Sequence, residues 1–355
     1  MKKNILLMGV SATVALSLFA GPLMSSSVQA VGNGPEMNEN QEIKLERLTS
    51  YEEMKTFLER VDRQADHISV ETIGQSVKER DIDLVKFGDN PANPTVLFLS
   101  QQHANEALVT EGVFQLIRHL SSNSREVRDL LENVNVLFVP RLNPDGAEGD
   151  VNWDTSHLLG GGQQTRNNAN GINLNRTHNS LSQPETRALH EQVLQKYDIA
   201  FAIDLHQQVA NRAIGDDELV SGSMLYPTSA VTDEVLLHSK QLGAIVYEAI
   251  ESKGYGTFAR YGAGDTLTSN ARNNFATHYG IPTLLFEMRG MTDSPNITSI
   301  LGQKSNGYLI NQAVTAMQET IRSVADGSIY EADVTIWDNL PTQYTLTPDS
   351  DEDGE

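Results

Sequence analysis

Four apolar segments of this chain each run directly into a polar, turn-rich segment, and this pattern constrains the fold more than any other feature. The pairs are “PTVLFLS” with “QQHANE”, “VNVLFVP” with “RLNPDG”, “DIAFAI” with “DLHQQ”, and “PTLLFE” with “MRG”. Continuous apolar runs of this length are typical of strands covered by helices on both faces. The polar segments therefore predict loops along one edge of a buried sheet, which is where open α/β sheets bind ligands.

Before, between and after these runs, apolar residues recur at helical spacing. Ser50 and Glu53 have the spacing of a capping box, and apolar residues follow at helical spacing. Further helices are predicted over residues 106–120, 182–195, 230–252 and 308–324. Gly327 is a plausible stop for the last of these helices.

Residues 68–74 and 82–88 alternate in polarity as paired strands do. Strands and helices then alternate along the chain without an internal repeat. This order predicts an α/β fold in which one sheet is covered by helices on both faces, rather than two domains. The chain has 355 residues, 39% of them hydrophobic and 21% charged, which is enough for one large domain.

Residues 1–30 are predicted to be a secretory signal. Lys2 and Lys3 precede an apolar run over residues 5–20, and “VQA” at 28–30 supplies small residues where a signal peptidase cuts. The alternative is a membrane anchor, but polar residues interrupt the run, which falls short of the roughly 20 apolar residues that a span needs. We therefore expect an exported protein, located in the medium or the cell envelope.

The mature chain is divided as follows. Residues 31–47 are polar and predicted to be a flexible lead-in, and residues 48–327 are predicted to form the folded catalytic domain. Residues 328–355 form a C-terminal extension whose acidic end, “TPDSDEDGE”, is predicted to be disordered. The lead-in is too short for a folded inhibitory prodomain, so we expect export in the active form.

Charge and cysteine content narrow the partners. The formal net charge of −21 becomes −23 when the signal segment with its two lysines is removed. Nucleic acids and anionic membranes bind proteins with basic surfaces, so we expect neither as a partner of this acidic chain. The chain contains no cysteine. Disulfides and thiolate metal sites are therefore excluded, and any metal must be bound by His, Asp or Glu.

A histidine and a glutamate three residues apart, His103 and Glu106, follow the first apolar run. With 9 histidines and 47 acidic residues in the chain, about one such pair is expected by chance. His206, at another predicted strand end, is the best candidate for a third ligand. Two histidines and one carboxylate suit a catalytic Zn²⁺, because they leave a coordination position open. Zinc lowers the pKa of bound water to about 7.

Glu287 ends the apolar run “PTLLFE”. A zinc-bound water needs a general base beside it, and Glu287 is a candidate because a carboxylate without a partner at the end of an apolar strand is costly unless it serves a function. A structural role for Glu287 is an equally open alternative.

Short motifs in a fixed order now converge on a family. “HANE”, “LNPDG”, “RNNANGINLNR”, “DLH” and “FEMRG” stand in the order found in zinc metallocarboxypeptidases of the carboxypeptidase A/B type. This resemblance extends over roughly residues 50–324. It implies a carboxypeptidase-like fold, with a mixed, mostly parallel, eight-stranded sheet in a single domain.

The resemblance also implies roles for individual residues. It makes His103, Glu106 and His206 the ligands of one zinc ion per chain, with Glu287 as general base. Four further residues match substrate-contacting positions of the family. Asn175 and Arg176 correspond to the pair that binds the terminal carboxylate, Arg166 to the arginine that stabilises the oxyanion, and Tyr261 to the substrate tyrosine. A guanidinium forms two parallel hydrogen bonds with a carboxylate, so the arginines suit these roles.

Two positions distinguish this chain from the family pattern. Asn173 stands where the family usually has an aspartate that hydrogen-bonds the first zinc histidine, and changes of this kind can cost about 10- to 100-fold in metal affinity or activity. Arg272 lies in the region expected to line the pocket for the terminal side chain. If Arg272 points inward, it favours an acidic terminal residue; the alternative is a solvated arginine.

The sequence therefore predicts a secreted, monomeric zinc metallocarboxypeptidase that acts on peptides with a free C-terminus. A murein peptidase that cuts a γ-glutamyl to diamino acid bond, or an amide deacylase, would use the same metal and base. A binding protein that has lost catalysis is a third possibility.

Overall fold

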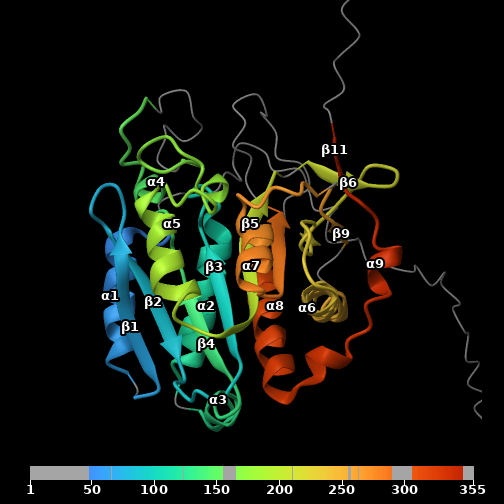
Figure 1. Cartoon of the computed structure of the whole chain (residues 1–355), viewed down its shortest axis with the longest axis horizontal. Coiled ribbons are helices and arrows are strands. Elements are labelled where there is room, and N and C mark those ends of the chain that lie inside the picture. Colours follow the sequence, from blue (N-terminus) through green and yellow to red (C-terminus); the bar gives the residue numbers. More distant parts are fainter. Residues whose placement is uncertain are drawn as a thin grey trace, which may run out of the picture.

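The predicted sheet is present in the computed structural model, which describes residues 48–64, 66–122, 124–154, 165–209, 211–254, 257–262, 264–289 and 306–346. It has eight strands in the order β1-β2-β4-β3-β5-β10-β8-β9 (Figure 1). The strands are β1 (Ile68–Gln75), β2 (Asp81–Phe87), β3 (Thr95–Ser100), β4 (Asn135–Val139), β5 (Ile199–Gln208), β8 (Gly222–Leu225), β9 (Phe258–Arg260) and β10 (Thr283–Arg289). The predicted signal, the lead-in and the acidic end of the chain lie outside the described residues.

The four apolar runs become four adjacent parallel strands. β4 pairs with β3, β3 with β5, and β5 with β10, in each case parallel. β2 and β8 flank this block and are antiparallel to their inner neighbours, while β8 and β9 are parallel to each other. The sheet is therefore mixed and mostly parallel, as predicted, and the carboxyl ends of the central strands share one edge.

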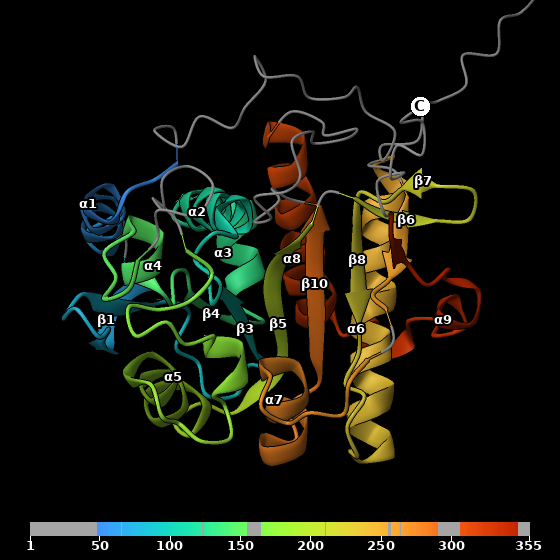
Figure 2. The same ribbon diagram turned by 90° about the horizontal axis from the view of Figure 1, so that it is seen from above.

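Helices cover both faces of the sheet because side chains alternate along each central strand. In β3, Val96 and Phe98 belong to one apolar cluster, whereas Leu97 and Leu99 belong to the other. Figure 2 shows α2 and α8 on one side of the sheet and α5 and α7 on the other. The α-helices are α1 (Tyr51–Asp62), α2 (Ala107–Leu120), α3 (Arg125–Leu131), α4 (Pro144–Glu148), α5 (Pro184–Leu189), α6 (Asp233–Ser252), α7 (Ala271–Tyr279), α8 (Asn306–Asp326) and α9 (Ile336–Asn339).

Local signals account for most helix ends. Ser50 and Glu53 form the predicted capping box of α1. α6 begins three residues later than predicted, because the Thr232 side chain accepts a hydrogen bond from the Val235 amide and caps the helix there. After α8, Gly327 adopts a left-handed conformation with φ of 80°, which ends the helix.

The predicted helix over residues 182–195 is present but changes its winding. It starts as α5 and continues as a π-helical turn, η6 (His190–Leu194). Two 3₁₀ turns, η5 (Leu174–Arg176) and η7 (Ser328–Glu331), complete the helical elements of the described residues. Single π-helical turns inside helices are frequent near functional sites, and His190 is the first residue of this one.

The C-terminal segment packs against the rest of the fold. Trp337 is 4% exposed, and a Cβ atom on Gly243 of α6 would lie only 2.2 Å from its ring. The Arg260 amide donates to the Pro341 carbonyl at 2.8 Å, at the end of β9. Beyond it, β11 (Tyr344–Thr345) pairs with β6 (Arg212–Ile214), which with β7 (Glu218–Leu219) forms a second, three-stranded sheet. Figure 1 shows this sheet beyond the ends of β5 and β10.

Within the described residues, none of the helices combines the length and apolar character needed to cross a bilayer.

Candidate metal centre and active site

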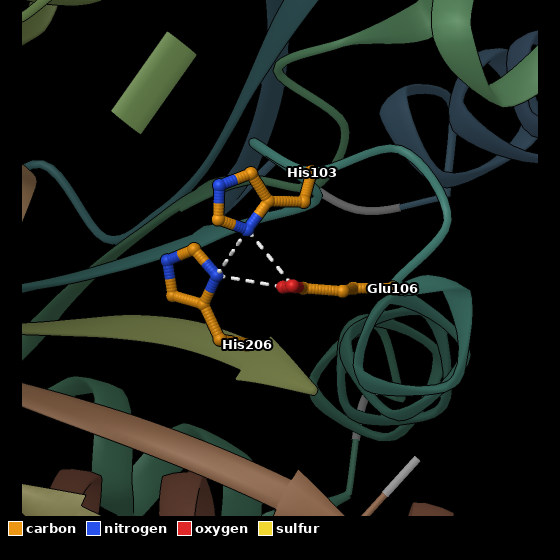
Figure 3. A group of neighbouring side chains, drawn as sticks. All are labelled: His103, Glu106 and His206. Carbon is orange, nitrogen blue, oxygen red and sulfur yellow. Dashed lines mark hydrogen bonds and ion pairs between the residues drawn. The ribbon is translucent and has the colours of Figure 1, made fainter. Parts of the chain in front are cut away.

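His103, Glu106 and His206 come together at the carboxyl edge of the sheet, although the last lies 100 residues beyond the second. His103 is in the turn after β3, Glu106 is the N-cap of α2, and His206 is near the end of β5. Their side chains point toward one another (Figure 3). Each residue is less than 5% exposed. The edge predicted from the apolar runs is therefore the place where this group forms.

The nitrogen and oxygen atoms of this group face each other at short range. Nδ1 of His103 lies 2.8 Å from one Glu106 oxygen, and Nδ1 of His206 lies 2.6 Å from the other. The two Nδ1 atoms are 3.1 Å apart. Lone pairs of two imidazoles and a carboxylate that converge in this way suit Zn²⁺. Among the described residues this is the one set of three or more such side chains close enough to share a metal ion.

The carboxylate of Glu106 is strongly favoured in its charged form. Burial opposes ionisation, but the neighbouring His103 and His206 outweigh it and hold the pKa of Glu106 well below its ordinary value. The backbone amide of Gln207 also donates to Glu106 at 3.1 Å. A negative ligand is therefore present without any change of protonation, as metal binding requires.

The remaining ring nitrogens of the two histidines have different partners. Nε2 of His103 lies 3.0 Å from Oδ1 of Asn173, so the amide oxygen accepts from this ring. Nε2 of His206 lies 3.0 Å from Oδ2 of Asp204 as an ion pair, and this oxygen has no hydrogen-bond partner among the described residues. Although burial disfavours the charged ring, Asp204 and Glu106 raise the pKa of His206 well above its ordinary value.

Glu287 lies beside this group. It is opposite His206 in the register of β10 and β5, so the two side chains project from the same face of the sheet. Glu287 is 8% exposed, and its Oε2 has no hydrogen-bond partner among the described residues. Burial is the main cause that raises the pKa of Glu287 to about 8.

Two of the other predicted residues approach the acids of the site. Arg166 donates from Nη1 to a Glu106 oxygen at 3.1 Å while its side chain remains 41% exposed. The Glu287 carboxylate, together with burial, raises the pKa of Tyr261 to about 12, so the phenol stays protonated and can donate. The structure thus places Arg166 and Tyr261 within electrostatic reach of the centre, and their roles remain predictions.

Asn175 and Arg176 differ in their surroundings. Asn175 is buried; its Oδ1 accepts from the Ala271 amide at 2.8 Å, and its Nδ2 lies 3.3 Å from Nε2 of His206. Arg176 is exposed and donates to the Asn175 carbonyl at 2.6 Å. Asn175 is therefore held against the metal group, whereas the guanidinium of Arg176 is open to solvent near it.

Arg272, at the start of α7, is 4% exposed, which excludes the alternative of a solvated arginine. Its Nη2 donates to Thr228 at 3.0 Å, and its Nε has no hydrogen-bond partner among the described residues. Burial lowers the pKa of Arg272, while Asp265, Asp204, Tyr261 and Glu287 act against this effect. Arg272 is therefore a buried cation with a free Nε; its Nη2 lies 3.9 Å from Oδ1 of Asp265, and Tyr261 and Glu287 are within electrostatic reach.

Sequence reasoning did not identify several residues that contact this site. Asp204 precedes His206 by two positions, and alternation along a strand places both on one face, so this signal was available. Gln102, next to His103, donates to Asp204 at 2.6 Å. His178 and His190, which no ligand spacing singled out, contact each other on the same side of the sheet.

Comparisons with known proteins agree with this geometry. A family model described as zinc carboxypeptidase matches residues 54–321. Human carboxypeptidase D is 29% identical in an alignment 213 residues long, which covers 54% of this chain but only 15% of that protein. A zinc carboxypeptidase of Saccharothrix mutabilis subsp. capreolus is 28% identical in an alignment 116 residues long, which covers 31% of this chain and 27% of that protein. The chain thus spans less than a third of these curated relatives.

Solved structures share the fold. The metallo-carboxypeptidase of Burkholderia cenocepacia has a TM-score of 0.59 at 20% identity, covering 78% of this chain and 69% of that one. Carboxypeptidase A of Helicoverpa armigera has a TM-score of 0.60 at 17% identity, covering 82% of this chain and 76% of that one. At these identities the likeness concerns the architecture, including the mixed eight-stranded sheet.

Proposed function

Because this chain belongs to the zinc carboxypeptidase family, we propose that it removes the C-terminal residue of peptides by hydrolysis. One observation carries the proposal: Glu287 stands next to His206 in the sheet, buried and with a free oxygen, beside a group suited to zinc. A metal site that served only structure would have no use for such a carboxylate, whose burial without a partner is costly.

The chemistry is divided between the metal and the side chains. When bound, zinc lowers the pKa of a water molecule and polarises a carbonyl group. The Glu287 carboxylate accepts a proton from the attacking water and later returns it to the leaving amine. The raised pKa of Glu287 supports this exchange, because a general base works best with a pKa near the working pH.

Substrate contacts follow from the positions of the charged and polar groups around Glu287. Arg166 stabilises the oxyanion, since its exposed guanidinium can leave Glu106 and turn to the substrate. Arg176, open to solvent, binds the terminal carboxylate together with Asn175. Tyr261 donates its phenol proton to the substrate, because it remains protonated at neutral pH.

Arg272 supports a preference for a terminal residue that carries a carboxylate. A buried guanidinium with a free Nε gains most from an anionic partner, which also satisfies its desolvated donor. Such a residue could be glutamate or aspartate, or a diamino acid with a side-chain carboxyl. The last case corresponds to a murein peptidase. The buried guanidinium of Arg272 with its free Nε is the observation that favours this second function.

We also propose that the protein acts outside the cytoplasm, on the basis of the apolar run after Lys2 and Lys3 and of the small residues at 28–30.

The test is hydrolysis by the purified chain with bound zinc. Peptides that differ only in the terminal residue (Glu, Phe, Lys) are compared with a γ-glutamyl-diaminopimelate substrate. We expect cleavage to stop when zinc is chelated, to return when zinc is restored, and to favour carboxylate-bearing terminal residues. Glu287→Gln should lower kcat by about 10²–10⁴-fold, the usual contribution of a general base, while zinc still binds in a 1:1 ratio.

Other outcomes are informative. Preferential cleavage of the γ-glutamyl bond would indicate that the substrate is murein rather than an ordinary peptide. Acyl-amino substrates cleaved in place of either would indicate a deacylase. A protein that binds zinc, cleaves none of these and is unchanged by Glu287→Gln would be a binding protein, and the proposed hydrolysis would be wrong.

A further inference from the structure

His103 and His206 each direct Nδ1 toward the metal site, and the Nε2 atoms on the other side of the two rings have different partners. Behind His103 stands the neutral amide of Asn173, while behind His206 stands the carboxylate of Asp204, which is 1% exposed. A carboxylate behind a metal-binding imidazole fixes the orientation of the ring and makes it a stronger ligand. In this chain the acidic partner therefore belongs to the histidine on β5.

Asp204 is in turn held by a continuous chain of hydrogen bonds. Nε2 of Gln102 donates to Oδ1 of Asp204 at 2.6 Å, and Oε1 of Gln102 lies 2.7 Å from Nε2 of His178. Nδ1 of His178 lies 2.9 Å from Nε2 of His190, and Nδ1 of His190 lies 2.8 Å from the Tyr279 hydroxyl. Tyr279, at the end of α7, is the partly exposed end of this relay; the other members are buried.

Chemistry fixes the direction of every bond in the relay. A carboxylate only accepts, so Gln102 must present its NH₂ to Asp204 and its oxygen to His178. His178 must therefore donate from Nε2, and because a neutral imidazole has one N–H, its Nδ1 accepts from Nε2 of His190. Nδ1 of His190 then accepts from Tyr279. All donors point from α7 toward Asp204.

The two histidines of the relay are suited to this neutral arrangement. Burial holds the pKa of His178 well below its ordinary value and lowers that of His190 to about 4. The groups that face them are Gln102, Tyr279 and the ring of Phe275. Repulsion from His190 and His206 adds to the effect of burial on the pKa of His178, and repulsion from His278 adds to it on that of His190. Among the described residues, neither ring has an acidic partner that would favour a second proton.

We propose that the relay Tyr279–His190–His178–Gln102 is a positioning device that fixes Asp204 behind His206, and that Asp204 there supplies the acidic support which Asn173 does not give to His103. The inference rests on zinc binding at the proposed active site and is independent of which bond the protein cleaves. Its key link is His178, because without a donor to its oxygen the Gln102 amide is no longer held at both ends, and its NH₂ group can move away from Asp204.

Two substitutions at His178 separate positioning from simple packing. His178→Gln keeps an N–H donor near the place of Nε2, whereas His178→Leu fills similar space without one. Both disrupt the contact with His190, so both should lower the unfolding free energy of the metal-free protein, His178→Leu by more because it leaves the buried Gln102 oxygen without a donor. Only His178→Leu should weaken zinc binding, by about 10- to 100-fold, the effect known for lost partners of metal ligands. Asp204→Asn should weaken it comparably.

Zinc dissociation constants measured by competition with a chelator provide the main test. His178→Gln should remain within about threefold of the unsubstituted protein, well inside the 10- to 100-fold range expected for His178→Leu. Equal zinc affinities for the two His178 variants would overturn the proposal. So would an unchanged affinity for Asp204→Asn.

A second measurement needs no variant and no metal. The ¹⁵N shifts of the imidazole rings in the metal-free protein report which nitrogen carries the proton. We expect Nε2–H for both His178 and His190, and Nδ1–H on either ring would overturn the proposal. Because neither measurement uses a peptide substrate, failure here is distinguishable from failure of the proposed hydrolysis.

Discussion

Among the described residues, two pairs of buried histidines are in contact, and only one of the pairs is suited to bind a metal ion. The rings of His103 and His206 are 4.8 Å apart at an interplanar angle of 52°, and those of His178 and His190 are 5.2 Å apart at 41°. In the first pair, Glu106 lies between the ring nitrogens and leaves their lone pairs directed at a common point. In the second pair, each nitrogen is used by a neighbour. Two imidazoles in contact are therefore not sufficient for a metal site. The site also needs a carboxylate, and ring nitrogens whose lone pairs are not used by other partners.

The largest effect is expected when the acid of the first pair, Glu106, is replaced. Glu106→Gln should weaken zinc binding by roughly a hundredfold or more, because apparent binding energies of about 10–16 kcal/mol are shared among the ligands and 1.4 kcal/mol corresponds to a factor of ten. The matched variant His190→Gln, in the other pair, should still bind zinc in a 1:1 ratio. Metal content after dialysis against a weak chelator checks both, and zinc retained by Glu106→Gln would contradict the assignment.

A second prediction uses the raised pKa of Glu287, which is about 8 in the folded protein against 4.5 ordinarily. The folded state then holds a proton that the unfolded state loses, so stability falls as pH rises between these values, by at most about 1.4 kcal/mol per pH unit. In the metal-free protein, Glu287→Gln should remove this decline. Urea unfolding at pH 5, 6.5 and 8 measures it, and parallel slopes for the two proteins would refute it.

The histidine pair of the relay should show a smaller dependence of opposite sign. The pKa of His190 is about 4 when folded and 6.5 ordinarily, so its neutral form is favoured by folding. Stability is then full above pH 6.5 and is lost as pH falls toward 4, again at no more than about 1.4 kcal/mol per unit for this group. His190→Gln should flatten this acid limb in the same unfolding measurements. An unchanged acid limb would mean that His190 is protonated in the fold.

The difference between the two pairs also explains what could be predicted from the sequence. His103 and Glu106 are neighbours on one turn, and His206 ends an apolar run, so each carries a local signal that strand topology turns into a site. Glu287 was found in the same way, since it also ends an apolar run. These residues depend on the carboxyl edge of a parallel sheet, which periodicity reveals.

The relay had no comparable signal. His178 lies in a loop after a 3₁₀ turn and His190 in a π-helical turn, and no periodicity relates two such elements. Tyr279 reaches His190 only because α7 packs on the same face of the sheet as α5. Asp204 is the exception, because it shares a strand face with His206. Residues brought together by packing of irregular segments, such as His178 and His190, require coordinates.

The packing of the last described residues has a practical consequence for anyone who shortens this protein. The Gln343 amide donates to the Arg260 carbonyl at 3.0 Å, and the residue after Arg260 is Tyr261. A gene trimmed at the end of the family match, residue 321, would delete Trp337 and leave an apolar hollow over Gly243. Expression boundaries should therefore be drawn beyond Leu346, so that the backbone hydrogen bonds of Pro341 and Gln343 with Arg260, the neighbour of Tyr261, are kept.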